Sequence, residues 1–185
     1  MNEVLRVIAE RRSVRKYKPE QIKEEELKLI LEAGLQAPSG HNDQPWFFTV
    51  IQNRELMNEI NEESKAGMRN SGIDWMINMA NNSLTDLMYG APTLVVIAGR
   101  TDAISSFADQ CAAIQNMLLA AESLGIGSCW LGLTNFYLKK RENLDKLGIP
   151  EGYEAYYCIT LGYKAEGVSY TAPKRKNPDC IKIIK

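Results

Sequence analysis

Three arginines and a serine follow the opening helical pattern of the chain, and their types suit the binding of a phosphate. They are Arg11, Arg12, Ser13 and Arg15, within the segment RRSVR. Guanidinium groups bind phosphate in a bidentate manner, and a serine hydroxyl adds a further hydrogen bond. The alternative is a solvated basic helix end, where positive charge complements the helix dipole. Taken alone, the segment favours this alternative.

A second basic cluster lies near the end of the chain. Lys174, Arg175 and Lys176 stand between Pro173 and Pro178. Two prolines restrict the backbone, which suits a fixed anion site, although a polar surface loop is the stronger interpretation of this cluster alone. The two basic clusters could converge on one phosphate, and the sequence leaves open whether they do.

A stiff polar loop, PSGHNDQPW, occupies residues 38–46. Ser39, Asn42 and Gln44 offer neutral donors and acceptors, which suit the edge of a planar heterocycle. The alternative is a helix-to-strand connection that caps itself through its Asn and Asp side chains. The sequence favours neither of these two interpretations over the other.

The segment GIGSCWLG, residues 125–132, offers backbone that a flat ligand can approach closely. One of its N–H groups could face a ring nitrogen. It is not a dinucleotide fingerprint, because Trp130 stands where the third glycine would be and the segment follows a helix. A helix C-cap followed by a buried strand is the favoured interpretation of this segment alone.

Side chains for acid–base, nucleophilic or metal chemistry are scarce. His41 is the single histidine, the four cysteines form no CxxC pair, and Cys129 has the apolar neighbours of an inert core thiol. No GxxxxGK[ST], HExxH or GxSxG motif is present. We therefore expect no metal site and no catalytic side chain, but a protein whose cofactor does the chemistry.

The elements that must position these segments follow from hydrophobic periodicity. We expect helices over residues 4–8, 23–36, 53–65, 72–89, 106–124 and 138–147. We expect strands over residues 46–51, 93–99, 128–133 and 156–161, and a possible fifth at the terminal CIKII. This pattern predicts one α+β domain over residues 1–185 with a central sheet. The 106–124 helix is apolar most of the way round, which favours burial between two subunits.

Composition narrows the class of protein. The 22 Lys and Arg residues balance 23 Asp and Glu residues, so charge gives no case for a nucleic acid or an anionic membrane as partner. The N-terminal residues lack a signal-peptide core, and the longest apolar stretch is too short to span a bilayer. We expect a cytoplasmic protein with reduced thiols.

The four segments, in this order and spacing, resemble the compact branch of the FMN-dependent nitroreductase family over essentially the whole chain. The resemblance implies an α+β fold in which helices flank a central mixed β-sheet. It also implies an intertwined homodimer with two FMN sites at its interface. Family members often carry Arg where this chain has Lys176, which leaves the charge in place but not a bidentate contact.

The resemblance assigns cofactor-binding roles segment by segment. The FMN phosphate and the pyrimidine edge would be held by Arg11, Arg12, Ser13 and Arg15, with Lys174 and Lys176 adding to the phosphate site. The other subunit would contribute the loop residues Pro38, Ser39, Gly40 and Asn42, with a less certain contact from Gln44. One flavin face would be covered by Cys129, Trp130, Leu131 and Gly132, with a backbone N–H near N5.

The implied activity is hydride transfer from NAD(P)H through flavin N5 to a small flat acceptor such as a nitroaromatic or a quinone, with ping-pong kinetics. A cation such as Arg15 would stabilise charge on the reduced ring. Alternatives within the fold are a reductive dehalogenase or a flavin-degrading enzyme. Alternatives from other functional classes are a protein that stores or senses FMN without turnover and a non-redox domain that binds another phosphorylated ligand.

Overall fold

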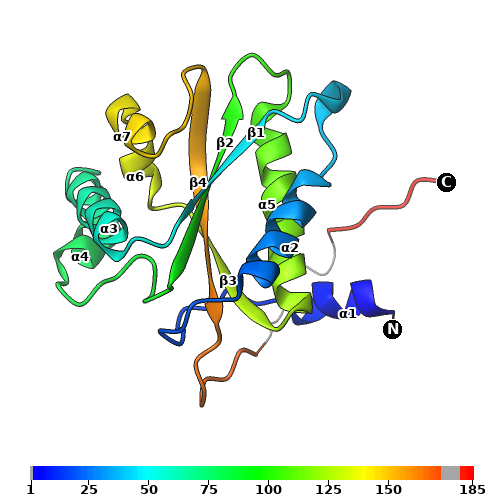
Figure 1. Cartoon of the computed structure of the whole chain (residues 1–185), viewed down its shortest axis with the longest axis horizontal. Coiled ribbons are helices and arrows are strands. Elements are labelled where there is room, and N and C mark those ends of the chain that lie inside the picture. The colour runs from blue at the N-terminus through cyan, green and yellow to red at the C-terminus, as the bar shows by residue number, and fades with distance from the viewer. Residues whose placement is uncertain (1, 172–179) are drawn as a thin grey trace.

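The computed structural model describes residues 2–171 and 180–185 (Figure 1). Its helices are α1 (Glu3–Glu10), α2 (Glu24–Leu35), α3 (Arg54–Arg69), α4 (Asp74–Asn81), α5 (Ser106–Ser123), α6 (Asn135–Leu138) and α7 (Arg141–Lys146), with a 3-10 turn η1 (Gly40–Asn42). Its strands are β1 (Trp46–Ile51), β2 (Thr93–Arg100), β3 (Ile126–Leu131) and β4 (Tyr153–Tyr163).

The four strands form one sheet in the order β1-β2-β4-β3, and each neighbouring pair is antiparallel. This corrects the expectation of a mixed sheet. β2 and β3 run in the same direction and are joined through α5, the arrangement that normally gives a parallel pair. Here β4 lies between them and runs opposite to both. The parallel pairing that the structure does contain is an isolated bridge between Ser13 and Ser128.

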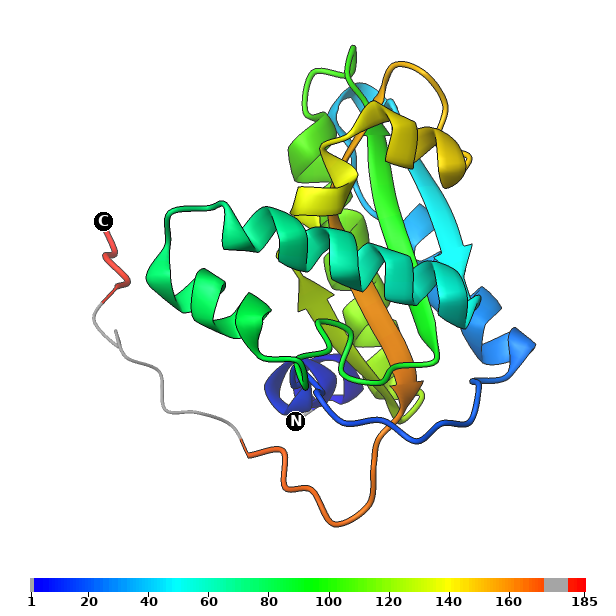
Figure 2. The same ribbon diagram turned by 90° about the vertical axis from the view of Figure 1, so that its left-hand side faces the viewer.

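Helices cover both faces of the sheet. In Figure 1, α2 and α5 lie on one side, and α3, α4, α6 and α7 on the other, as Figure 2 shows from the side. β2 alternates between the two resulting cores: Leu94 and Val96 pack on the α3 side, and Val95 and Ile97 on the α5 side. The near-continuous apolar run of this strand therefore has cover on both faces.

Most elements lie within a few residues of their expected bounds, and two helical predictions are wrong in extent. Within 72–89 only α4 is helical, because the Asn82 side chain accepts the Leu84 N–H at 3.0 Å and starts a turn. The expected 138–147 helix corresponds to α7, and α6 is a separate short helix before it that was not expected. Asn143 Nδ2 donates to the Tyr137 carbonyl at 3.0 Å and links α7 to α6.

The chain end CIKII shows no strand within residues 180–185. Ile181, Ile183 and Ile184 are exposed there. Over the described residues, no helix combines the length and apolar character that a membrane span requires.

Candidate functional site

The opening basic segment lies directly along β3. Val14 N–H donates to the Ser128 carbonyl at 2.8 Å, and Ser13 forms the parallel bridge with Ser128. This pairing places Ser13 and Arg15, the residues on either side of Val14, beside Cys129. Burial raises the pKa of the Cys129 thiol, and Arg15, Ser13 and Arg11 act against that rise. Two of the four segments, far apart in sequence, are thus brought together.

A cavity of about 400 Å³ opens beside this segment, lined by cations and hydroxyl groups. Its lining residues are Arg12, Ser13, Arg15, Ser169, Tyr170 and Thr171. Such a lining offers charge-assisted and neutral hydrogen bonds to an anion. The cavity chemistry therefore supports the anion-site interpretation of Arg12, Ser13 and Arg15 over that of a solvated helix end.

Besides lining this cavity, Arg12 also stabilises the end of α1. Its Nη1 donates to the carbonyls of Ala9 at 2.7 Å and Arg11 at 2.6 Å, which satisfies acceptors at the end of α1. Its Nε is buried and has no hydrogen-bond partner within the described residues. A buried donor without a partner is costly, so this atom remains a candidate for a ligand contact.

The C-terminal segment runs alongside the same region. Tyr170 Oη donates to the Lys16 carbonyl at 3.1 Å, Ala165 N–H donates to it at 3.2 Å, and Tyr17 forms an antiparallel bridge with Lys164. The second basic cluster begins three residues after Thr171. Lys174 and Lys176 themselves lie outside the described residues.

A second, smaller cavity of about 140 Å³ adjoins the end of β3. Arg15 lines it together with Leu87, Tyr89 and residues 129–134, so Arg15 is common to both cavities. Sequence reasoning missed Leu87 and Tyr89, which lie in the Met- and Asn-rich stretch to which no motif could be assigned. The aromatic residue before Gly90 was the available signal.

The side chain of Trp130 lies on the α5 side of the sheet. Its ring packs edge-on against Tyr157, with centroids 5.3 Å apart, and Tyr157 in turn lies 5.9 Å from Phe107 of α5. Cys129, its neighbour along the strand, packs into the opposite core. The two faces of β3 therefore differ: Trp130 lies on the α5 side, and Cys129 and Leu131 lie on the opposite side.

The polar loop lies elsewhere in the subunit. Gly40 N–H donates to Ser105 Oγ at 3.1 Å and to Asp109 Oδ1 at 3.2 Å, which fixes the loop to the N-terminal end of α5. α1 lies at the other end of α5 in Figure 1. Pro38, Ser39, Gly40, Asn42 and Gln44 are thus not brought to Arg11, Arg12, Ser13 and Arg15 within one chain.

Backbone strain marks both halves of the candidate site. Among the described residues, those other than glycine with positive φ are His41, Asn42, Gln44 and Tyr89, at 52°, 59°, 46° and 58°. Each such residue costs of order 1–3 kcal/mol, and strained residues cluster where function requires a fixed geometry. Three of them are in the polar loop, and the fourth faces Arg15.

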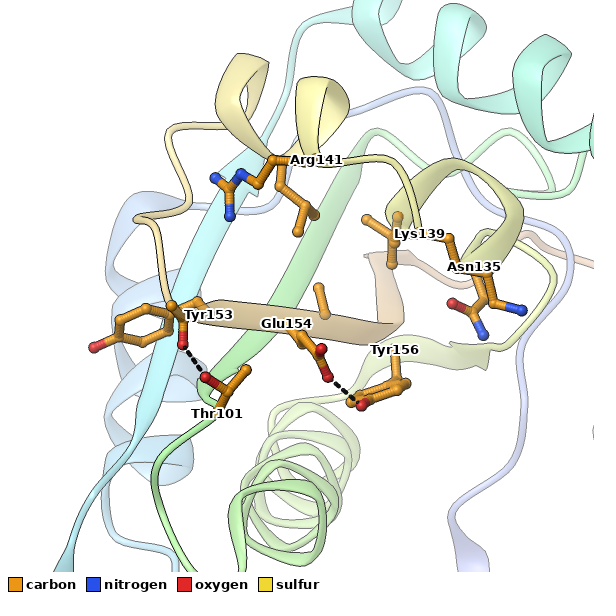
Figure 3. Close-up of a pocket in the computed structure, with 11 residues that line it drawn as sticks. Thr101, Asn135, Lys139, Arg141, Tyr153, Glu154 and Tyr156 are labelled. Carbon is orange, nitrogen blue, oxygen red and sulfur yellow. Dashed lines mark hydrogen bonds between the residues drawn. The ribbon is translucent and has the colours of Figure 1, made fainter.

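The cavity in Figure 3, of about 450 Å³, shares no residue with the predicted site. Several of its polar side chains are engaged with the protein: Tyr156 Oη donates to Glu154, Thr101 Oγ1 donates to the Gly152 carbonyl at 3.0 Å, and Arg141 pairs with Asp145. It is a gap between β4 and the α6–α7 pair rather than a set of groups aimed at a ligand.

Known proteins resemble this chain along its full length. The Nitroreductase family model matches residues 8–163. A protein of Archaeoglobus fulgidus that carries the name NADH dehydrogenase/NAD(P)H nitroreductase is 36% identical over 183 residues, which are 98% of this chain and 97% of the relative. Crystal structures of nitroreductases with bound FMN from Bacteroides fragilis and Desulfitobacterium hafniense are 38% and 35% identical over 100% of both chains, with TM-scores of 0.92 and 0.88. The chain therefore belongs to the nitroreductase family.

Proposed function

We propose that the protein is an FMN-dependent oxidoreductase that passes hydride from NAD(P)H to a small flat acceptor such as a nitroaromatic or a quinone. The observation that carries the proposal is the pair of adjoining cavities that meet at Arg15. One is lined by cations and hydroxyls, and the other by Leu87, Tyr89 and the mostly apolar residues 129–134. This arrangement suits FMN, which has an anion at one end and a planar ring at the other.

The residues present fit this cofactor. Arg11, Arg12 and Ser13 would hold the phosphate, joined by Lys174 and Lys176, and the unpartnered Nε of Arg12 is the kind of donor that a phosphate oxygen satisfies. Arg15 would lie at the pyrimidine edge, where its charge favours the reduced ring. Bound FMN would supply the hydride acceptor and donor.

We assign no proton transfer to Cys129, which lies at this site. The thiol of Cys129 is buried and its pKa is raised by that burial, so it stays protonated and neutral at physiological pH. The Cys129 to Gly132 segment would cover one face of the ring and leave the other for the nicotinamide and the acceptor in turn. Ping-pong kinetics follow.

The proposal includes a homodimer in which each site is shared. Pro38, Ser39, Gly40, Asn42 and Gln44 of one subunit would complete the site that Arg15 begins in the other. Two observations favour this: the loop is held at the far end of α5, and α1, α2 and α5 expose many apolar side chains. These are Val4, Leu5, Ile8, Leu29, Leu35, Phe107 and Leu124.

Anaerobic stopped-flow absorbance tests the activity. Purified protein should be yellow, and NADH or NADPH should bleach the flavin within seconds or faster; subsequent mixing with nitroaromatics and quinones should restore the colour. Flavin that binds but is reduced by neither nicotinamide would support a storage or sensing protein instead. Colourless protein that takes up no added FMN would contradict the whole proposal.

Cys129→Ser is expected to retain flavin reduction at close to the wild-type rate, because the thiol packs in the core and transfers no proton. A hydroxyl in place of the thiol in these apolar surroundings should lower the protein's free energy of unfolding by about 1–3 kcal/mol. Stopped flow and thermal unfolding measure the two effects. A variant that binds FMN but is not reduced would show that the chemistry has been assigned to the wrong groups.

A further inference from the structure

A tight turn between α4 and β2 holds Tyr89 in the left-handed backbone region, with φ at 58°. The Asp86 carboxylate accepts hydrogen bonds from the backbone N–H groups of Met88 at 2.8 Å and Gly90 at 2.7 Å. Tyr89 N–H donates to the Asp86 carbonyl at 3.1 Å. Since a bulky residue seldom adopts this conformation, the turn must be held by its surroundings.

The turn is also fixed to α3 and to the core. Asn61 Oδ1 accepts the Leu87 N–H at 2.9 Å. The side chains of Leu87 and Met88 are 3% and 1% exposed. The backbone at Tyr89 is therefore fixed by the packed part of the fold, and the Tyr89 ring packs against the same core.

The ring of Tyr89 faces the guanidinium of Arg15, whose Cζ lies 5.7 Å from the ring centroid. This is within the range of a cation–π interaction. Partial burial acts to lower the pKa of Arg15, but its interaction with the Tyr89 side chain acts in the other direction, and the pKa lies above its usual value. Within the described residues, no carboxylate forms an ion pair with Arg15.

We infer that Tyr89 is a positioning residue for Arg15, whose guanidinium its ring holds at the junction of the two cavities. The inference rests on the proposed function, because FMN is the ligand that Arg15 would meet there. The strain at Tyr89 has a physical role in this arrangement. It keeps the aromatic face in place before the cofactor arrives, so that less order has to be gained on binding.

Titration of apo-protein with FMN tests the inference in two variants. Tyr89→Asn removes the ring, and Asn tolerates the left-handed region, so the turn should persist. We expect its FMN affinity to fall roughly two- to thirtyfold, the range of a cation–π contact. Tyr89→Phe, the matched control, keeps the ring and should remain close to wild type. Thermal unfolding of both apo-variants reports whether the fold is intact.

A double-mutant cycle separates positioning from a general structural role. In an Arg15→Ala background, Tyr89→Asn should have little further effect on FMN affinity, because the side chain that it positions is gone. Wild-type affinity in Tyr89→Asn, or an equal loss in both backgrounds, would overturn the inference while leaving the proposed function intact. Wild-type protein that binds no FMN would overturn both.

Discussion

Replacing Arg15 by alanine is expected to weaken FMN binding roughly ten- to a hundredfold, the worth of a charge-assisted contact of about 1.5–3 kcal/mol. Arg15 is the side chain common to the cation-lined cavity and the cavity at the end of β3. Its loss removes a donor to the cofactor and the positive charge that favours the reduced ring. The midpoint potential of the bound flavin should therefore fall as well. Fluorescence titration of apo-protein and anaerobic redox titration measure these effects.

Arg6→Ala is the matched control for this experiment. Arg6 is on α1, one turn before the site, and its guanidinium is engaged by Glu3 and Glu10. Exposed pairs of this kind contribute little to stability. We expect FMN affinity in Arg6→Ala to equal that of the wild type. An equal loss of FMN affinity in both variants would mean that the loss of any arginine in this region weakens binding. Unchanged affinity in Arg15→Ala would show that Arg15 does not contact the cofactor.

The elements were predictable from sequence wherever one periodicity dominates a segment. WFFTVI is a strand over the expected residues, and α2 and α5 lie within one residue of their expected bounds. The antiparallel sheet was not predictable, because β4 lies between β2 and β3. The order of strands in a sheet depends on long-range packing, which the local sequence pattern of a strand does not indicate. The end of α4 was set by the side chain of Asn82, which competes with the backbone for a hydrogen bond.

The candidate site was predictable where residue type alone points to a ligand. Arginines beside a serine indicate an anion site wherever the chain places them. Tyr89 was not predictable, because its role depends on a turn built by the Asp86 side chain and on contact with a residue 74 positions earlier. For Arg12, the residue type predicted a contact with a ligand. The structure shows a second role that the sequence did not indicate, because its guanidinium also caps the C-terminal end of α1.

Mixing the subunits of two variants is expected to restore FMN binding. The FMN concentration is chosen so that neither variant binds the cofactor on its own. One variant is Arg15→Ala. The other is Asn42→Gly, which removes the loop side chain and suits the positive φ at that position, 59°. If each site joins Arg15 of one subunit to Asn42 of the other, every homodimer of either variant has two damaged sites.

A heterodimer of the two variants differs, because both lesions fall in the same site and the other site is wild type. Random pairing makes half of the dimers mixed, so about one quarter of all sites should recover wild-type affinity. Co-expression with two different affinity tags would isolate the heterodimer, in which one site of the two should bind FMN tightly. Equilibrium dialysis counts the sites directly.

The reciprocal mixture supplies the control. When a chain that carries both substitutions is paired with the wild type, each heterodimer has one lesion in each site, so no wild-type site remains in it. Placing the two lesions in different chains should therefore restore binding, and placing them in one chain should abolish it. If each subunit instead used its own loop, the outcomes would be reversed: the first heterodimer would have no intact site, and the second would have one. A monomer that carries tightly bound FMN in analytical ultracentrifugation would likewise contradict the shared site, because the loop at the N-terminal end of α5 would then have no site to complete.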